Sequence, residues 1–264
     1  MKSKYLYVGC GADQLESFIH ADISVYKISK IKDPNKKKID IICDITEEIP
    51  LPDKSIELVY SRETLEHLTW RELINHFIEC NRILEDGGII RMSLPNFDKM
   101  IERYKNNDED LDEAIKNSET SKFLAPIENH TDLFISRILY HDHYYLHNFD
   151  TMNRALKKCG FAEVTIVKPG ETKIKNLEDI LFRAEHSTND KELTFRLEAV
   201  KILSPSILKY EMKKPKNIIK RLFASLFNIS FTPYIKRRPM FPSNKWFLEK
   251  FLKLKQLSTY NKKY

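Results

Sequence analysis

Hydrophobic and polar residues follow two different periods along residues 4–203. Short apolar runs bounded by polar residues or glycine predict seven β-strands. These are expected at residues 5–8, 19–23, 39–42, 56–60, 89–94, 161–167 and 194–201. In two other stretches, 70–84 and 151–159, apolar residues recur every three or four positions, which is typical of helices packed on a sheet. Asp86-Gly87-Gly88, just beyond the end of the first of these helices, is expected to stop it. Alternating strands and helices predict an α/β fold.

Glycine and acidic residues mark the ends of the first predicted strands. The chain has only six glycines, and two of them, Gly9 and Gly11, directly follow the first strand. Glycine tolerates positive φ and lets the backbone approach a ligand closely. Asp22 and Asp44 follow the second and third strands, and an acid placed after the second strand of an open α/β sheet accepts hydrogen bonds from ribose hydroxyls. Gln14 replaces the third glycine of a dinucleotide-binding motif, so the pattern favours another nucleoside ligand.

Six short segments extend this pattern in a characteristic order. They are Val8–Asp13, Ala21–Ile23, Cys43–Ile45, Ile49–Glu57, Leu65–Leu68 and Asn81–Ile90. In this order and spacing, residues 4 to about 203 resemble a class I S-adenosylmethionine (SAM) methyltransferase of the type 11 kind. The resemblance implies a Rossmann-like sheet of seven strands with helices on both faces, and SAM as the cofactor.

The resemblance also implies which residues bind the cofactor. The segment Gly9–Asp13 would wrap its amino-acid part, Asp22 would bind the ribose, and Asp44-Ile45 would flank the adenine. The end of the fourth strand would lie near the sulfonium. The cofactor-binding residues expected on this basis are Gly9, Cys10, Gly11, Asp13, Asp22, Ile23, Asp44, Ile45, Ser61 and Glu63. The alternative for the two strand-end aspartates is an ordinary role in shaping turns.

The connection between the first two strands is unusually short. Only ten residues separate Gly11 from Asp22, too few for the long helix that normally joins these strands. This shortened form resembles a subgroup associated with bacterial surface-polysaccharide pathways. The association is an analogy between folds rather than a property of the site.

Residues 97–149 are expected to form a substrate-side insertion or lid, because ligands of open α/β folds bind at the carboxyl edge of the sheet. Its last part contains His141, His143 and His147 among several tyrosines. If the acceptor is a hydroxyl, a base must remove its proton, and histidine titrates near neutrality. We expect His143 in that role, then His147 or His141, with His67 less favoured. The histidine spacing matches no known ligand frame, so no metal site is predicted. The alternative is a packed lid without chemical function.

The last sixty residues differ from the rest in charge. From Pro205 onward the chain holds fifteen of its 44 basic residues but only two of its 38 acidic residues. We therefore divide the chain into a SAM-binding domain at 1–204 and a basic extension at 205–264. An amphipathic helix is expected near Asn217–Asn228, with an apolar face that would dock on an anionic membrane surface. The alternatives are a flap packed on its own domain or on a second copy, and an RNA-binding tail.

Other features point to the cytoplasm. The four cysteines are scattered without a C-x-x-C pair, which indicates neither a zinc site nor a disulfide framework. The first strand is expected to begin at residue 5, which leaves no room for a signal peptide. The longest apolar run is about half the roughly 20 residues that span a bilayer. We expect a cytoplasmic protein, peripheral at the membrane if the extension binds lipid.

The expected activity is methyl transfer from SAM to a small-molecule or glycan acceptor, with a hydroxyl of a cell-surface polysaccharide as the favoured target. The end of the fourth strand, Ser61-Arg62-Glu63, lacks the Asn/Asp-Pro-Pro-Tyr motif of enzymes that methylate nucleic-acid bases. Nucleic acid is therefore a less favoured partner. The alternatives are an RNA or protein methyltransferase that uses the basic tail, and a methyltransferase-like binding partner without activity.

Overall fold

One seven-stranded sheet in the order β3-β2-β1-β4-β5-β7-β6 forms the centre of the fold. Its strands are β1 (Tyr5–Val8), β2 (Phe18–Asp22), β3 (Ile41–Ile42), β4 (Ile56–Arg62), β5 (Leu84–Pro95), β6 (Phe161–Ile166) and β7 (Thr194–Lys201). The computed structural model describes residues 4–210 except 12, 24–38, 107–130, 133, 136–142, 187–193 and 208. All strands run parallel except β7, which is antiparallel to both of its neighbours. The strand order reverses beside β1, as in a doubly wound sheet. The predicted Rossmann-like α/β fold is therefore confirmed.

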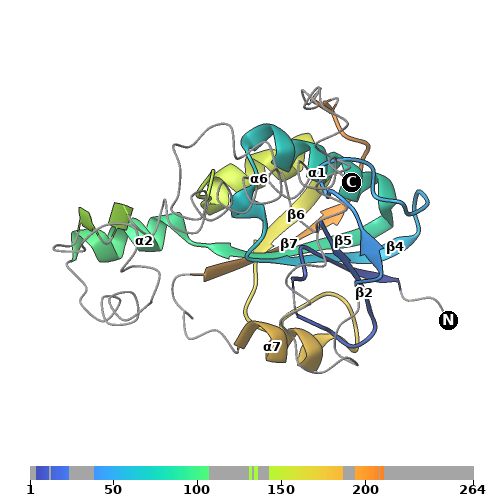
Figure 1. Cartoon of the computed structure of the whole chain (residues 1–264), viewed down its shortest axis with the longest axis horizontal. Helices are drawn as coiled ribbons and strands as arrows, with labels where there is room; N and C mark the ends of the chain where they lie inside the picture. Colours follow the sequence, from blue (N-terminus) through green and yellow to red (C-terminus); the bar gives the residue numbers. More distant parts are fainter. Residues whose placement is uncertain are drawn as a thin grey trace, which may run out of the picture. The chain divides into compact units, whose positions relative to one another are not determined.

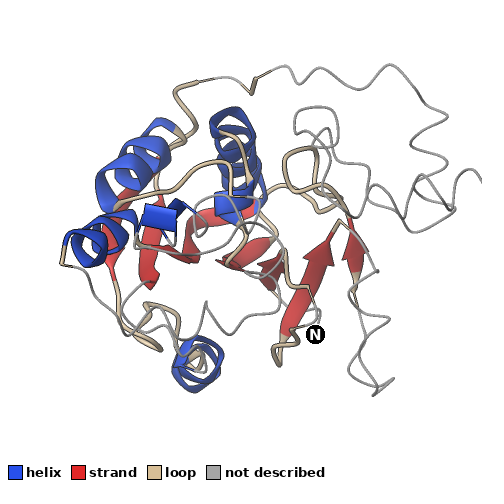
Figure 2. Ribbon diagram, turned by 60° about the vertical axis from the view of Figure 1, so that its left-hand side comes forward, coloured by secondary structure: helices blue, strands red, loops and turns tan. Residues whose placement is uncertain are grey.

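Helices cover both faces of this sheet. The helices in the described part of the chain are α1 (Trp70–Ile83), α2 (Phe97–Lys105), α6 (Phe149–Lys158) and α7 (Glu178–His186), with a short 3-10 helix η3 (Leu65–His67) after β4. Of these, α2 extends away from the end of the sheet (Figure 1). Figure 1 shows α1 and α6 on one face and α7 on the other, and Figure 2 shows the strands between these helix layers. Successive strand residues point to opposite faces, so Leu6 and Val8 join the core under α1 and α6 while Tyr7 joins the core under α7.

The start of α1 is fixed by a capping box. The Thr69 side chain accepts a hydrogen bond from the Glu72 backbone N–H, and the Glu72 carboxylate accepts one from the Thr69 backbone N–H. Such reciprocal bonds satisfy two of the unpaired N–H groups at a helix start. The apolar stripe predicted for this helix faces the core.

The helix predicted at 70–84 has its expected bounds to within one residue, but Asp86-Gly87-Gly88 do not stop it as expected. The helix ends at Ile83, and Leu84 is already extended, buried and paired with Ile56 of β4. The glycines instead lie inside β5, where the register shifts so that Leu58 pairs with Ile89. Because Leu84 is buried against β4, β5 begins at Leu84, before the two glycines.

Helix α7 covers the part of the sheet that the short first connection leaves open. The described residues between β1 and β2 form turns rather than a helix. Leu177 and Leu181, just before and within α7, pack with Tyr7, Leu58 and Tyr60 on this face. A helix from the connection between β6 and β7 thus replaces one that the connection from β1 to β2 is too short to supply.

A buried ionic network ties α7 to the sheet. Arg91 of β5 is fully buried and forms ion pairs of 2.7 Å with Glu185 of α7 and 2.8 Å with Glu198 of β7. Its guanidinium also donates to the backbone oxygens of Glu171 and Lys168, at 2.7 and 3.2 Å. Buried charges are tolerated when they are paired and hydrogen-bonded, and these contacts join α7 to β5 and β7.

The first residues of the predicted extension lie against α1. The Asn75 side-chain amide donates to the Tyr210 backbone oxygen at 2.9 Å and accepts from its N–H at 2.6 Å, while Lys209 pairs with Glu79. These residues belong to the first of two compact units, Met1–Met212. The rest of the extension, including the helix expected near 217–228, lies outside the described residues. Within the described part of the chain, no helix has the length and apolarity needed to span a membrane.

Candidate cofactor and acceptor site

The strand register gathers the predicted cofactor residues at one edge of the sheet. Val8 of β1 is aligned with Ala21 of β2 and with Ser61 of β4, and Asp22 is aligned with Ile42 of β3. The residues that follow these positions therefore emerge side by side at the carboxyl ends of adjacent strands. This is where open α/β sheets bind their ligands.

The glycine turn after β1 requires both of its glycines. Gly9 and Gly11 have φ of +63° and +56°, a backbone conformation that other residues rarely adopt. A Cβ on Gly9 would also lie 2.2 Å from the Cγ2 atom of Thr64, which follows β4. The Gly9 N–H donates to the Ala21 oxygen and the Gly11 N–H to the Asp22 carboxylate, both at 2.8 Å. Asp22 therefore holds the turn in place from the neighbouring strand.

The residues after β3 and the cysteine of the glycine turn have clear local roles. Oδ1 of Asp44 accepts from the N–H and the hydroxyl of Thr46, at 2.9 and 2.7 Å, which is the turn role left open by the sequence. Ile45 is buried, whereas Ile23 is exposed apolar surface at the same edge.

Burial, with the nearby Asp22 carboxylate, raises the pKa of the Cys10 thiol to about 12. Cys10 is therefore a packed thiol rather than a nucleophile.

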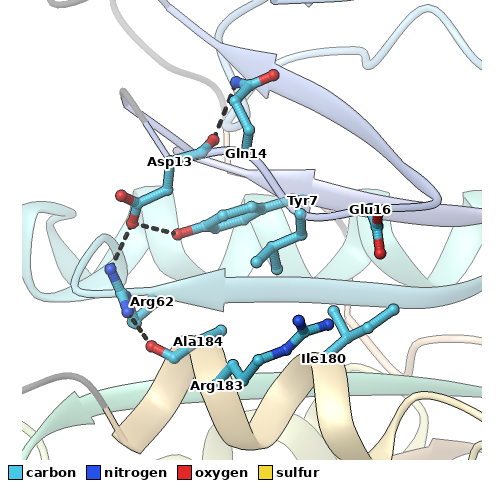
Figure 3. A pocket seen from close by; sticks show the side chains of 9 residues that line it. Tyr7, Asp13, Gln14, Glu16, Arg62, Ile180, Arg183 and Ala184 are labelled. Atoms are coloured by element: carbon cyan, nitrogen blue, oxygen red, sulfur yellow. Dashed lines mark hydrogen bonds and ion pairs between the residues drawn. The ribbon is translucent and has the colours of Figure 1, made fainter. Parts of the chain in front are cut away.

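A cavity of about 360 Å³ opens between the glycine turn and α7 (Figure 3). Its lining residues are Tyr7, Asp13, Gln14, Leu15, Glu16, Arg62, Ile180, Arg183 and Ala184. The Asp13 carboxylate accepts a hydrogen bond from the Tyr7 hydroxyl at 3.3 Å and is ion-paired with Arg62. Arg62 in turn donates to the backbone oxygen of Ala184 on α7. Burial and the Asp13 carboxylate raise the pKa of Tyr7, so its phenol stays protonated and remains a donor.

Two carboxylic acids and two histidines gather just after β4. Glu63 has φ of +46° and precedes η3, which carries Glu66 and His67. The rings of His67 and His143 lie 5.2 Å apart, and the N–H of Tyr144 donates to the Glu66 backbone oxygen at 2.9 Å. Burial and the neighbouring Glu63 raise the pKa of Glu66 well above its usual range. The end of the insertion thus returns to the carboxyl end of β4.

The three histidines predicted for the acceptor side have different positions. His143 lies half-buried beside His67. His147 is only 1% exposed, its backbone pairs with Asn96 at the end of β5, and burial lowers the pKa of its imidazole to about 4. His141 lies outside the described residues. Of the two that are described, His143 is therefore the one placed near the molecular surface.

The sequence did not identify two parts of this site. Arg62 stands directly beside the predicted Ser61, which is buried, and Glu63, which is exposed. The only sequence signal for Arg62 as the ion-pair partner of Asp13 was its position at the end of a strand. Helix α7 buries Leu181 together with the charged Glu185. A weak apolar pattern of this kind does not distinguish a helix from a loop.

Comparison with known proteins finds matches for the part of the chain that holds β1 to β4 and most of β5. Residues 6–92 match a family model described as a methyltransferase domain. A probable S-adenosylmethionine-dependent methyltransferase from Mycolicibacterium smegmatis is 31% identical over 100 residues, which are 34% of this chain and 37% of the relative. The match therefore spans little more than a third of the relative's length.

Two solved structures are also similar to this chain. Phosphoethanolamine N-methyltransferase 2 from Haemonchus contortus, in complex with phosphomonomethylethanolamine and S-adenosylhomocysteine, is 14% identical with a TM-score of 0.44. The alignment covers 77% of this chain and 50% of that one. A SAM-dependent methyltransferase from Thermotoga maritima, possibly a histamine N-methyltransferase, is 15% identical with a TM-score of 0.44, covering 76% and 83%.

Proposed function

We propose that this chain, which carries a class I SAM-dependent methyltransferase domain with SAM as its cofactor, methylates a hydroxyl of a small-molecule or glycan acceptor. The observation that carries the proposal is the alignment of Val8, Ala21 and Ser61. It brings the glycine turn, Asp22 and the end of β4 to one edge of the sheet. The glycan class is favoured by the short connection from β1 to β2.

The residues at this edge fit the chemistry of the cofactor. The positive φ of Gly9 and Gly11 leaves a side-chain-free turn that a ligand can approach closely. Asp22 accepts a hydrogen bond from the Gly11 N–H through one carboxylate oxygen, and we propose that this carboxylate also accepts one from a ribose hydroxyl. Asp13 and Arg62 present opposite charges beside the cavity, which complement the ammonium and carboxylate of a methionine moiety.

The cofactor supplies an activated methyl group on a sulfonium. The acceptor oxygen forms the new C–O bond as the S–CH₃ bond breaks, the bonding electron pair stays on sulfur, and the hydroxyl proton leaves to a base. The protein's contribution is to align the reacting atoms and exclude water. We propose that the segment His143–His147, which packs against η3 and the end of β5, forms the acceptor side.

Replacing Asp22 by asparagine is expected to weaken SAM binding by about 1.5–3 kcal/mol, the range for a hydrogen bond to a charged group. Asparagine retains an oxygen for the Gly11 N–H, so the turn is kept while the charge is lost. Calorimetric titration of SAM measures the change, with Asp150→Asn on the exposed start of α6 as the control. Folded wild-type protein that does not bind SAM, or an Asp22→Asn affinity equal to wild type, contradicts the proposal.

Methyl-transfer assays on cell-envelope glycan intermediates, with RNA and protein as competing substrates, then define the acceptor.

We also propose that the basic extension binds an anionic membrane surface from the cytoplasmic side. Each basic residue near an anionic leaflet contributes about 1 kcal/mol. Flotation of the full chain with liposomes is expected to require anionic lipid and to weaken with salt. A chain ending at Met212 keeps the contacts of Lys209 and Tyr210 with α1 and should lose binding. Equal flotation of the truncated chain, or no binding by the full chain, excludes the anchor.

A further inference from the structure

Glu66, His67 and His143 form a cluster that the predicted methyl transfer does not by itself explain. One carboxylate oxygen and one ring nitrogen from each histidine all lie within 4.8 Å of one another. Glu66 and His67 come from η3, and His143 comes from the end of the insertion after β5. We propose that these three side chains bind a divalent transition-metal cation.

The donor set determines which cations fit. Two imidazoles and one carboxylate are the ligands of many catalytic zinc sites and of non-haem iron sites. Magnesium and calcium prefer oxygen ligands and suit this cluster less well. Ligands of a tetrahedral zinc lie about 3.3 Å apart, whereas these atoms lie within 4.8 Å of one another, so they must close by up to about 1.5 Å. His67 and His143 are half-buried rather than enclosed in the core, which leaves room for this adjustment.

The environment of Glu66 is the second observation. Its side chain is 1% exposed, and Oε2 has no hydrogen-bond partner among the described residues. A buried carboxylate oxygen without a partner costs free energy, and buried charges are usually paired or bound to metals. The Glu63 side chain hydrogen-bonds that of Glu66. A cation at this point would satisfy the free oxygen.

The backbone holds the two halves of the cluster together. The N–H groups of Tyr144 and Tyr145 both donate to the Glu66 backbone oxygen, at 2.9 and 3.3 Å. These backbone hydrogen bonds hold the end of the insertion against η3. His143 is therefore anchored beside η3 by the residues that follow it, although it lies far from Glu66 and His67 in the sequence.

A cation with three protein ligands keeps a coordination position open for another molecule. A metal ion lowers the pKa of an oxygen bound to it, so an acceptor hydroxyl at this position would lose its proton to water more readily. His143 would then serve as a ligand rather than as the base. This consequence rests on the proposed function, whereas cation binding does not.

Titration of the chelator-treated full chain with Co²⁺ tests the site, because cobalt bound by histidines in a four- or five-coordinate site absorbs visible light. We expect one cobalt per chain, displaced by Zn²⁺. Glu66→Gln and His143→Asn should each lower affinity by at least about 100-fold, more than the loss of a supporting residue costs. His186→Asn on the exposed end of α7 is the matched control and should bind as wild type.

Circular dichroism of each metal-free variant establishes that it is folded, and His67→Asn replaces Glu66→Gln if burial of the amide prevents folding. Absence of stoichiometric cobalt binding to the wild type, or equal affinity in folded ligand variants, overturns the proposal. SAM titration of the same samples separates the two proposals. If the chain binds SAM but not cobalt, only the proposed cation site is contradicted. If it binds cobalt but not SAM, only the proposed function is contradicted.

Discussion

Replacing His143 by alanine is expected to lower the rate constant of methyl transfer by about 10²–10⁴-fold, the range for loss of a group that assists proton removal. The ring of His143 lies beside His67 at the end of β4. The glycine turn is held separately, by Ala21 and Asp22. The affinity for SAM should therefore remain nearly unchanged. Single-turnover measurements with saturating SAM and a glycan acceptor identified by the substrate screen report this rate directly.

The matched control is His186→Ala, which removes an imidazole from the exposed end of α7 and should retain the wild-type rate. If His143→Ala transfers methyl groups as fast as wild type, His143 has no role in the reaction. A parallel loss in Glu66→Gln, restored in neither variant by added Zn²⁺, is the pattern expected when both side chains are ligands of one cation. Loss in His143→Ala with full activity in Glu66→Gln assigns His143 to the base role instead.

Most of the sheet could be predicted because its strands carry their own signals. Tyr5–Val8 and Thr194–Lys201 have the predicted bounds, since a short apolar run and a strict alternation are both local patterns. The ends of α1 and β5 were harder to predict. Leu84 continues the apolar pattern of the helix but pairs with Ile56, so a contact distant in sequence decides its conformation.

The gathering of the predicted cofactor residues at one edge of the sheet was predictable for a different reason. In a parallel sheet, residues that follow adjacent strands meet at one edge, and Gly9, Asp22 and Ser61 all stand at such positions. The acceptor side depends on how the insertion folds back. The contact between Tyr144 and Glu66 joins segments with no shared pattern, so the cluster of Glu66, His67 and His143 is visible only in three dimensions.

Helix α7 shows the same limit for a buried polar group. Its inward face includes Glu185, which is fully buried. Hydrophobic periodicity does not reveal a helix when one of the residues it buries against the sheet is charged. Arg91 similarly occupies a position in β5 where an apolar residue would be expected. Each charge is understandable only from its partner on another element.

Replacing Arg91 by methionine is therefore expected to lower the free energy of unfolding by about 3–5 kcal/mol, because removal of one partner leaves buried charge uncompensated. Glu185 and Glu198 would lose their ion pairs of 2.7 and 2.8 Å. Urea unfolding followed by circular dichroism measures the change. Lys54→Met, which breaks the exposed pair with Asp86, is the control and should cost no more than about 1 kcal/mol.

A second variant distinguishes loss of charge balance from loss of packing. Arg91→Met combined with Glu198→Gln removes one charge of each sign and leaves Glu185 paired with Arg196 at 3.5 Å. It should be more stable than Arg91→Met alone, because no buried carboxylate is left without a cation. If the single variant is no less stable than Lys54→Met, the network does not hold α7 on the sheet. Because α7 contributes Ile180, Arg183 and Ala184 to the cavity beside Asp13 and Arg62, a helix loosened by Arg91→Met should also bind SAM more weakly. The combined variant should recover part of that affinity along with its stability, since both depend on the same seating of α7 against β5.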